Sequence, residues 1–312
     1  MKIKYIMMAV ALTALTSCDD YEVFEREQYK NVFAFICNSE NVNTKMVHLD
    51  RDETMGYVAF SVGGSKPLDR DVTVNVVEDR GLIDAYNKSN FDLNVGKYAK
   101  PLPARFYNIA SLKCVLKAGS IKGEMPISIH PEGLSPDTTY FIPLRVESYD
   151  ACELNPEKSF ILYHVMMKNK WAKSDGSTVY TMRGKRKDAA GGTEISLPGT
   201  KIVTPLSKNS VRVMVGNETY SSSKEAFERA AMVLEIADDG AVTIKPYRDL
   251  AIQQLDGDAE FSNKFYYEND GYNTYKTFLL HYRYTIGQAS YEMKEELRLQ
   301  YSKDTEEEED KL

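Results

Sequence analysis

The 312-residue sequence has few of the residues that build catalytic or metal centres: one tryptophan, four cysteines and four histidines. The cysteines follow no metal-binding or redox spacing, and the histidines are scattered along the chain. There is no phosphate-binding loop, zinc motif or Gly-x-Ser-x-Gly nucleophile elbow. The net charge of −7 argues against a nucleic-acid partner, because such proteins carry a basic footprint. We therefore expect no cofactor, no metal and no nucleic-acid binding.

Long hydrophobic runs are also missing, apart from one near the N-terminus. This run, Ile6 to Leu15, has about ten residues, whereas a membrane-spanning helix needs about 20. Lysines precede it, and the motif Leu-Thr-Ser-Cys that ends at Cys18 follows it. This is the pattern of a signal peptide with a lipobox, and an ordinary signal peptide beside a chance cysteine is the alternative. We predict cleavage before Cys18 and attachment to the membrane only through lipid on that cysteine.

Acidic residues follow the predicted lipidated cysteine directly. Asp19, Asp20 and Glu22 resemble the signal that exports Bacteroidetes lipoproteins to the outer cell surface, and they also suit a solvated tether. The resemblance implies an outer-membrane protein that is lipid-anchored and faces the cell exterior. On this interpretation residues 1–17 are the signal peptide and residues 18–27 the tether.

Residues 28–168 have the pattern of an antiparallel β-sandwich, with about seven short strands separated by turn residues. Val72, Val74 and Val76 alternate with polar residues, as in a half-buried strand. Segments 140–147 and 159–168 are predicted to pair across Asn155-Pro156. Pro143 cannot donate a ladder hydrogen bond, so it predicts an edge strand or a kink there.

Residues 171–302 predict a second, antiparallel β-structure with one short helix at 224–230. Strands are expected at 178–182, 201–205, 211–215, 232–236 and 241–245. The clearest signal is a final hairpin, in which apolar residues alternate over 278–286 and 291–301. We expect a barrel, because closure removes exposed strand edges. The acidic tail, 303–312, is predicted to be disordered.

Several short motifs give the chain a family resemblance. The first half resembles an Ig-like domain of unknown function at the N-terminus of many Bacteroidetes surface lipoproteins. The second half resembles the lipocalin-like domain that often accompanies it. The first resemblance depends on Asp84-Ala85-Tyr86-Asn87, Leu102-Pro103, Lys117-Ala118-Gly119, Ile127, Ile129 and Tyr140-Phe141-Ile142-Pro143-Leu144, and the second on Trp171, Tyr282-Arg283-Tyr284 and Glu295-Glu296-Leu297.

Such lipoproteins belong to polysaccharide-utilisation systems, beside an outer-membrane transporter and its lid lipoprotein. The resemblance therefore implies glycan capture, with the transporter and its lid as possible partners. A structural or adhesin-like subunit that binds other outer-membrane proteins is the alternative function.

A tyrosine-rich stretch, 265–275, is the candidate glycan site. Sugar sites need a flat aromatic surface for the C–H face of the ring, together with carboxylates and amides for the hydroxyls. The stretch mixes four tyrosines with Asn, Asp and Glu, and we expect it to form a loop before the final hairpin. The candidate glycan-binding residues are Trp171, Tyr266, Tyr267, Tyr272 and Tyr275. Burial of these tyrosines in a barrel, and of Trp171 at the domain junction, is the alternative.

A glycosidase would need two carboxylates flanking the scissile bond. The candidate pairs are Asp238 with Asp239, Asp256 with Asp258, and Glu268 with Asp270. All lie beside Gly or Asn in contexts typical of turns, where aspartate is common for conformational reasons alone. We therefore expect a protein that is not an enzyme, with glycosidase as the alternative.

Overall fold

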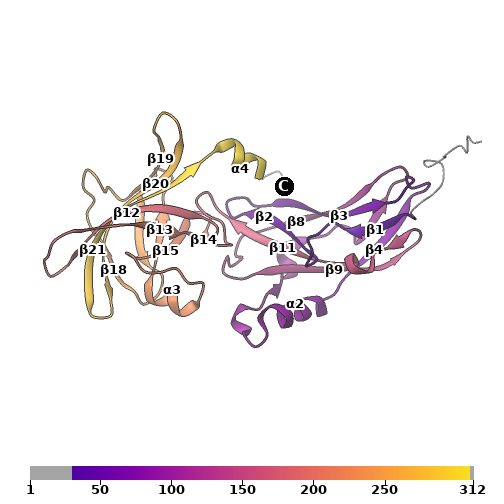
Figure 1. The fold of residues 1–312 in the computed structure, drawn as a ribbon, viewed down its shortest axis with the longest axis horizontal. Coiled ribbons are helices and arrows are strands. Elements are labelled where there is room, and N and C mark those ends of the chain that lie inside the picture. The colour runs from indigo at the N-terminus through magenta and orange to yellow at the C-terminus, as the bar shows by residue number, and fades with distance from the viewer. Residues whose placement is uncertain (1–29, 310–312) are drawn as a thin grey trace, which may run out of the picture.

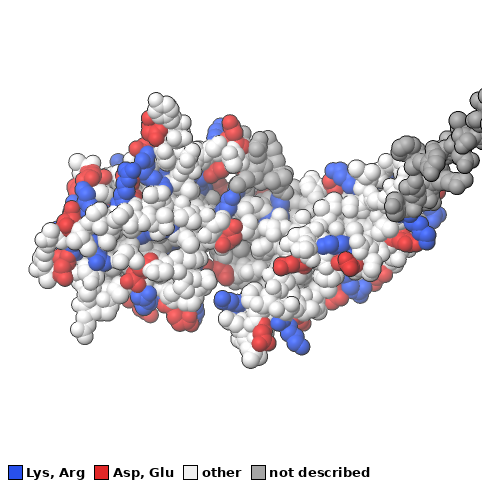
Figure 2. Space-filling view, in the orientation of Figure 1, with Lys and Arg blue, Asp and Glu red and all other residues white. Residues whose placement is uncertain are grey.

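The computed structural model describes residues 30–309, which form two β-rich domains joined end to end (Figure 1). The predicted signal peptide, Cys18 and the tether lie outside the described residues. Each domain has its own apolar core, one built from residues between Phe33 and Met167 and the other from residues between Trp171 and Leu297. Acidic and basic side chains are interspersed over the face seen in Figure 2. The nearly all-β, two-domain fold predicted from the sequence is confirmed.

The first domain is a sandwich of two sheets. The first sheet has the order β10 (Glu153–Leu154), β1 (Val32–Phe35), β3 (Thr54–Gly63), β8 (Lys122–Ile129) and β6 (Tyr107–Asn108). The second has the order β2 (Val42–His48), β11 (Phe160–Lys168), β9 (Tyr140–Tyr149), β4 (Val72–Glu78) and β7 (Lys113–Leu116), with β5 (Lys100–Pro101) also on β9. Short 3₁₀ turns lie at Val95–Lys97, Ala104–Phe106 and Pro156–Lys158.

Alternation explains most of this sandwich. Val72, Val74 and Val76 point into the core from β4, because successive side chains of a strand face opposite sides of the sheet. β9 and β11 pair antiparallel across the turn at Asn155, as predicted. The sandwich is not wholly antiparallel, however, since β1 with β10, β2 with β11 and β5 with β9 run parallel.

Pro143 lies in an interior strand, so of the two predicted alternatives, an edge strand or a kink, the edge strand is wrong. β9 has β11 on one side. On its other side β5 pairs as far as Phe141, and β4 begins at Leu144. Pro143 therefore lies between two partner strands, where no ladder hydrogen bond is required of its nitrogen. Its carbonyl still accepts a hydrogen bond from the Asp79 backbone amide.

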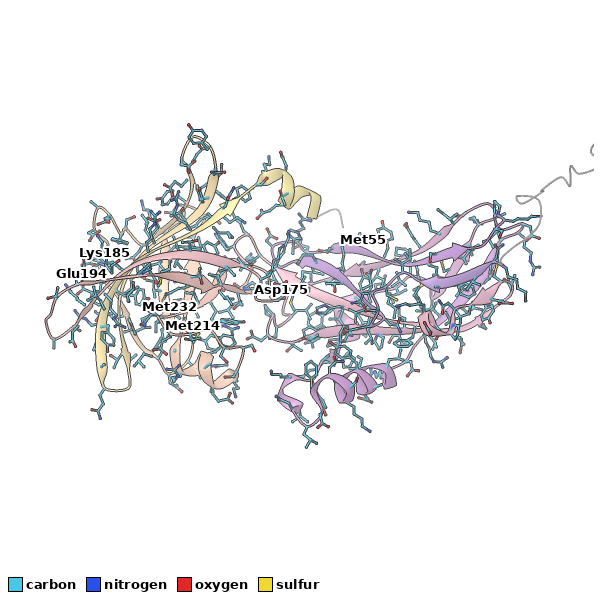
Figure 3. All side chains as sticks on the ribbon, viewed as in Figure 1. Met55, Asp175, Lys185, Glu194, Met214 and Met232 are labelled. Atoms are coloured by element: carbon cyan, nitrogen blue, oxygen red, sulfur yellow. The ribbon has the colours of Figure 1, made fainter. Side chains whose placement is uncertain are left out.

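The second domain folds two antiparallel sheets over one core. The larger sheet has the order β13 (Ile195–Ile202), β12 (Val179–Asp188), β21 (Ala289–Tyr301), β20 (Thr274–Ile286) and β18 (Ala251–Gln254), with β19 (Lys264–Asn269) also on β20. The smaller has the order β14 (Thr204–Ser207), β15 (Ser210–Met214), β16 (Ala231–Ile236) and β17 (Val242–Pro246). Figure 3 shows Met214 and Met232 inside this domain, where both are buried.

The two sheets contact each other along their edges, so the domain is curled like a barrel but is not one continuous closed sheet. The strand expected at 201–205 is interrupted at Val203, where the chain passes from β13 in one sheet to β14 in the other. At another seam the Gln254 side chain bridges β18 and β17: it accepts a hydrogen bond from the Ile244 amide and donates one to the Val242 carbonyl. A side-chain amide thus takes the place of a backbone ladder there.

Three helices complete the described chain. α2 (Gly81–Phe91) packs beside β9, and α3 (Lys224–Ala230) forms where a short helix was predicted. α4 (Lys303–Glu309) replaces the disordered tail expected from the acidic composition. Figure 1 shows α4 above the junction of the two domains. Glu306 of this helix forms an ion pair with Lys276 of β20, which gives the tail a fixed partner.

Candidate functional site

The tyrosine-rich stretch forms a β-hairpin, so the expectation of a loop is wrong. β19 and β20 pair along their length, from Lys264 opposite Leu279 to Asn269 opposite Thr274, and residues 270–273 form the turn between them. The Asp270 carboxylate accepts hydrogen bonds from the Tyr272 and Asn273 amides at 3.0 and 2.7 Å, which shape the turn. Because strand residues alternate between faces, the neighbouring tyrosines are separated rather than gathered.

Tyr267 is the tyrosine that faces the domain junction. It lies opposite Lys276 in the sheet, and its ring centroid is 5.1 Å from that of Tyr301 on β21. The Lys170 ammonium lies 5.3 Å from the Tyr267 ring centroid. Tyr267 is 41% exposed, so part of its ring is available to a ligand. Burial raises the pKa of its phenol, with Tyr301 and Glu306 contributing, so the hydroxyl remains a hydrogen-bond donor at neutral pH.

Trp171 does not offer a stacking surface, contrary to its selection as a candidate. It is only 6% exposed and belongs to the core of the second domain. Its ring meets Phe265 edge-on, at a centroid distance of 5.7 Å and an interplanar angle of 88°. Among the described residues its buried indole N–H has no hydrogen-bond partner. Trp171 is therefore a core residue beneath the junction.

The other candidate tyrosines lie elsewhere on the hairpin. Tyr275 is covered by the Arg298 guanidinium, 4.0 Å from its ring centroid, and Arg298 also contacts Glu268 at 3.0 Å. Tyr266 is near the same charges, although it reaches the edge of a hollow that Tyr267 lines. Tyr272, in the turn, is 95% exposed and lines neither hollow beside Tyr267. The structure thus brings Tyr267 and Trp171 together, with Tyr266 at the edge.

Two adjoining hollows meet at Tyr267, and we call them together the junction groove. Their volumes are 650 and 690 Å³, and both are lined by Asp50, Lys170, Trp171 and Tyr267. The first hollow adds Lys208, Asn209, Ile236, Ala237, Asp238, Asp239, Gly240, Phe265 and Tyr266. The second adds first-domain residues His48 and Arg51, the segment between the domains, and residues of β20, β21 and α4. Both domains therefore contribute to the groove.

The groove has the chemistry of a site for a polyhydroxylated ligand. Tyr267 supplies a partly exposed ring, while Asp238, Asp239 and Asn209 supply acceptors and an amide donor around the first hollow. Aromatic rings with polar groups close by suit ligands that have both C–H faces and hydroxyls.

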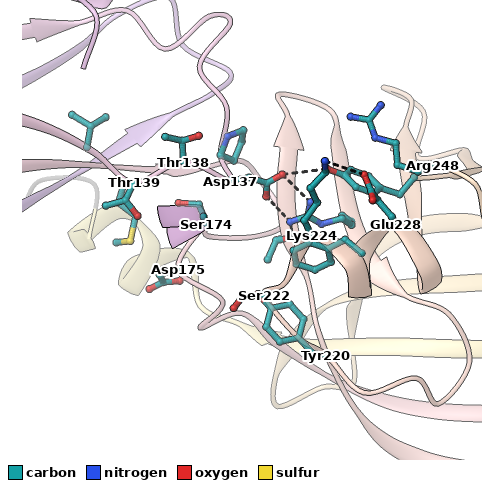
Figure 4. A pocket seen from close by; sticks show the side chains of 18 of the residues that line it. Asp137, Thr138, Thr139, Ser174, Asp175, Tyr220, Ser222, Lys224, Glu228 and Arg248 are labelled. Atoms are coloured by element: carbon teal, nitrogen blue, oxygen red, sulfur yellow. Dashed lines mark hydrogen bonds and ion pairs between the residues drawn. The ribbon is translucent and has the colours of Figure 1, made fainter. Parts of the chain in front are cut away.

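A separate pocket of 390 Å³, which the sequence did not predict, lies between the domains (Figure 4). Arg212 on β15 is 2% exposed and donates to both carboxylate oxygens of Asp137, at 2.9 and 2.5 Å. Its guanidinium carbon is 3.5 Å from the Phe227 ring centroid, and the Tyr247 hydroxyl donates to Asp137 at 3.3 Å. The pocket is therefore closed at one side by an ion pair that connects the domains.

Hydroxyl groups and charges from both domains line the rest of this pocket. Figure 4 shows Thr138, Thr139, Ser174 and Asp175 on one side, and Tyr220, Ser222, Lys224, Glu228 and Arg248 on the other. The sequence signal for the ion pair is Arg212, which stands in the otherwise apolar segment Val211–Val215. In the structure every residue of this segment is buried. A charge in such a segment needs an oppositely charged or hydrogen-bonding partner.

At least one carboxylate of each pair considered for catalysis is engaged in another contact. Asp258 contacts Lys294 at 2.6 Å, and this lysine, with the amides of Glu260 and Phe261, holds the pKa of Asp258 well below its usual range. Glu268 contacts Arg298, and Asp270 shapes the hairpin turn. Asp239 accepts a hydrogen bond from the Ala241 amide. In residues 30–309 no group of three or more His, Cys, Asp or Glu side chains is placed to hold a metal.

Comparisons with known proteins agree with the two-domain fold. One family model, described as an N-terminal domain, matches residues 27–152, and another, described as a C-terminal domain, matches residues 159–298. The chain shares its two-domain fold with Bacteroides proteins of known structure. No curated protein matches it in sequence. Within residues 30–309, no helix combines the length and apolar character needed to span a bilayer.

Three solved structures illustrate this similarity. A protein of unknown function from Bacteroides ovatus has a TM-score of 0.64 at 13% identity, covering 88% of this chain and 98% of its own. A multidomain protein from the same species that includes DUF1735 has a TM-score of 0.63 at 13% identity, covering 86% and 94%. An auxiliary nutrient binding protein from Bacteroides thetaiotaomicron has a TM-score of 0.58 at 14% identity, covering 88% and 96%. At these identities the similarity establishes the fold alone.

Proposed function

We propose that this chain is a non-catalytic glycan-binding protein, and that the glycan binds in the junction groove. The observation that carries the proposal is Tyr267, which is partly exposed and lies between two hollows lined by carboxylates, an amide and lysines. A sugar ring stacked on Tyr267 would place its hydroxyls within reach of these groups. The name of the B. thetaiotaomicron neighbour, an auxiliary nutrient binding protein, supports a binding role.

The cellular setting is part of the same proposal. Cleavage before Cys18 and lipid on its thiol would tether the protein to the outer membrane, facing the cell exterior. An outer-membrane transporter and its lid lipoprotein would then receive the captured polysaccharide. Growth in labelled palmitate tests the anchor: the chain should incorporate label, and Cys18→Ala should not. Label in the Cys18→Ala chain would contradict lipidation at this residue.

Binding is tested by retardation of the mature chain in native gels that contain neutral or acidic polysaccharides. Tyr267→Ala should weaken retardation about tenfold or more, because loss of a central aromatic contact costs about 2 kcal/mol. Tyr272→Ala is the matched control, since Tyr272 is exposed in the hairpin turn and lines neither hollow. Equal binding by both variants would exclude the groove while preserving the function.

A structural subunit is the second candidate, favoured by an apolar loop that follows α2. Leu93 and Val95 are among the most exposed large apolar side chains of the described chain. Exposed apolar groups of this kind often mark protein contacts. Cross-linking in intact cells separates the two functions: a partner captured through residues 93–95, with no retardation by any polysaccharide, would favour the structural subunit.

A further inference from the structure

The second hollow of the junction groove contains a buried cation. Lys276 is 4% exposed, and its ammonium donates to the Lys170 carbonyl at 2.7 Å and to the Glu306 carboxylate. The ammonium also lies 4.9 Å from the Tyr301 ring centroid. Tyr301 in turn contacts Tyr267, so the cation adjoins the proposed stacking surface.

Positive charge accumulates around this lysine. The hollow is lined by His48, Arg51, Lys168, Lys170, Lys173 and Lys276, whereas its acidic residues are Asp50 and Glu306. This balance is opposite to the net charge of −7 carried by the whole chain. Burial lowers the pKa of Lys276, and the charges of Lys168 and Lys170 lower it further, while Glu306 opposes them.

The negative charge that balances Lys276 comes from the end of the chain. Glu306 belongs to α4, which begins directly after β21, and its side chain is partly exposed. A buried ammonium requires an anionic or hydrogen-bonding partner, because an uncompensated charge in a low-dielectric site is costly. An anion that entered from solvent could satisfy Lys276 in the same way as Glu306, provided that Glu306 moved aside.

We propose that the Lys276 hollow is an anion subsite of the junction groove, which takes the carboxylate or sulfate of an acidic glycan. In the free protein Glu306 occupies this subsite in place of the ligand. The inference rests on the proposed glycan-binding function and adds the class of glycan. A sugar ring beside Tyr267 and Tyr301 would direct its acidic substituent to the Lys276 ammonium, and Glu306 would act as a tethered competitor.

The test compares the mature wild-type chain with Glu306→Gln, which removes the competing charge and preserves side-chain size. Calorimetric probes are neutral galactan, galacturonan and sulfated galactan, so carboxylate and sulfate are examined separately. Glu306→Gln should bind an acidic polymer about tenfold more tightly than wild type, because removing a bound competitor raises the fraction of open sites. Asp304→Asn, an equal charge change at an exposed position of α4, should leave binding unchanged.

A second variant, Lys276→Met, should abolish the preference for acidic over neutral polymer, and Trp171 emission reports whether it remains folded. If Glu306→Gln binds only galacturonan more tightly, the subsite takes a carboxylate. If it binds only sulfated galactan more tightly, the subsite takes a sulfate. If any of the three polymers binds and Glu306→Gln alters no affinity, the anion subsite is excluded while glycan binding stands. If no polymer binds any variant, the glycan-binding function fails and the subsite with it.

Discussion

The ion pair of Lys201 and Glu295 inside the second domain offers a stringent test of how that domain is stabilised. The Lys201 ammonium lies 2.6 Å from the Glu295 carboxylate, and the two side chains are 4% and 0% exposed. Lys201 also donates to the Met214 carbonyl at 2.8 Å. The Tyr282 hydroxyl donates to Glu295 at 3.0 Å and accepts from the Gly216 amide at 2.9 Å. Each member of this network therefore depends on the others.

Removing one partner should lower the free energy of unfolding far more than removing both. Glu295→Gln leaves the Lys201 cation uncompensated in the core, and breaking a buried pair in this way costs about 3–5 kcal/mol. Lys201→Met leaves Glu295 without its counter-charge, and burial already raises the pKa of that carboxyl. The double variant Lys201→Met with Glu295→Leu removes both charges, and such apolar replacements cost about zero or even stabilise. The two changes should thus be strongly non-additive.

Urea unfolding followed by tryptophan emission measures this effect in the correct domain. Trp171 is the single tryptophan and lies in the same core as the pair. Lys245 and Glu235 provide the control: they also approach to 2.6 Å but are 51% and 43% exposed, so Glu235→Gln should cost less than about 1 kcal/mol. A loss of less than about 1 kcal/mol in Glu295→Gln, or additive losses in the double variant, would refute this reasoning.

Two further predictions concern the interdomain pocket. His164 of β11 lines this pocket, and burial lowers its pKa to about 4. The unfolded chain therefore binds more protons than the folded chain between about pH 4 and about pH 6.5, and stability should fall as the pH falls through this range. The wild-type chain should lose about 2 kcal/mol between pH 7 and pH 5 from this group, and an equal pH dependence in His164→Gln would contradict the assignment. Asp137→Asn should lower the unfolding free energy by about 2 kcal/mol, because the buried Arg212 loses its counter-charge and one of the two oxygens that accept its hydrogen bonds. An unchanged urea midpoint would show that the ion pair is dispensable.

The parts of the fold that could be predicted from the sequence are those in which apolar and polar residues alternate along a strand. The valines of β4 and the apolar residues of β20 and β21 recur every second position, so their strands and buried faces follow from the chain itself. The same rule predicts that Glu295 is buried. It is the one charged residue among the alternating positions from Tyr291 to Tyr301 that face the core. Its partner on β13 depends on sheet pairing, which sequence spacing does not reveal.

The candidate site was harder to predict because it depends on long-range contacts. Sequence proximity suggested one cluster of tyrosines, but strand geometry sends Tyr266 and Tyr267 to opposite faces of β19. Tyr301 and Lys276 reach the groove only because β20 pairs with both β19 and β21. The acidic tail was predicted to be disordered from its composition. Composition does not reveal that Glu306 has a buried cation, Lys276, as its partner.

The central claim is that a glycan binds in the junction groove beside Tyr267. Titration of the mature chain with a broad panel of neutral and acidic polysaccharides, followed together by calorimetry and Trp171 emission, tests it most directly. We expect micromolar to millimolar binding of at least one polysaccharide and a saturable change in emission, since Trp171 lies beneath the groove. In the Tyr267→Ala chain both signals should require about tenfold or more polysaccharide to saturate. Absence of heat and of any emission change across the whole panel would contradict the claim.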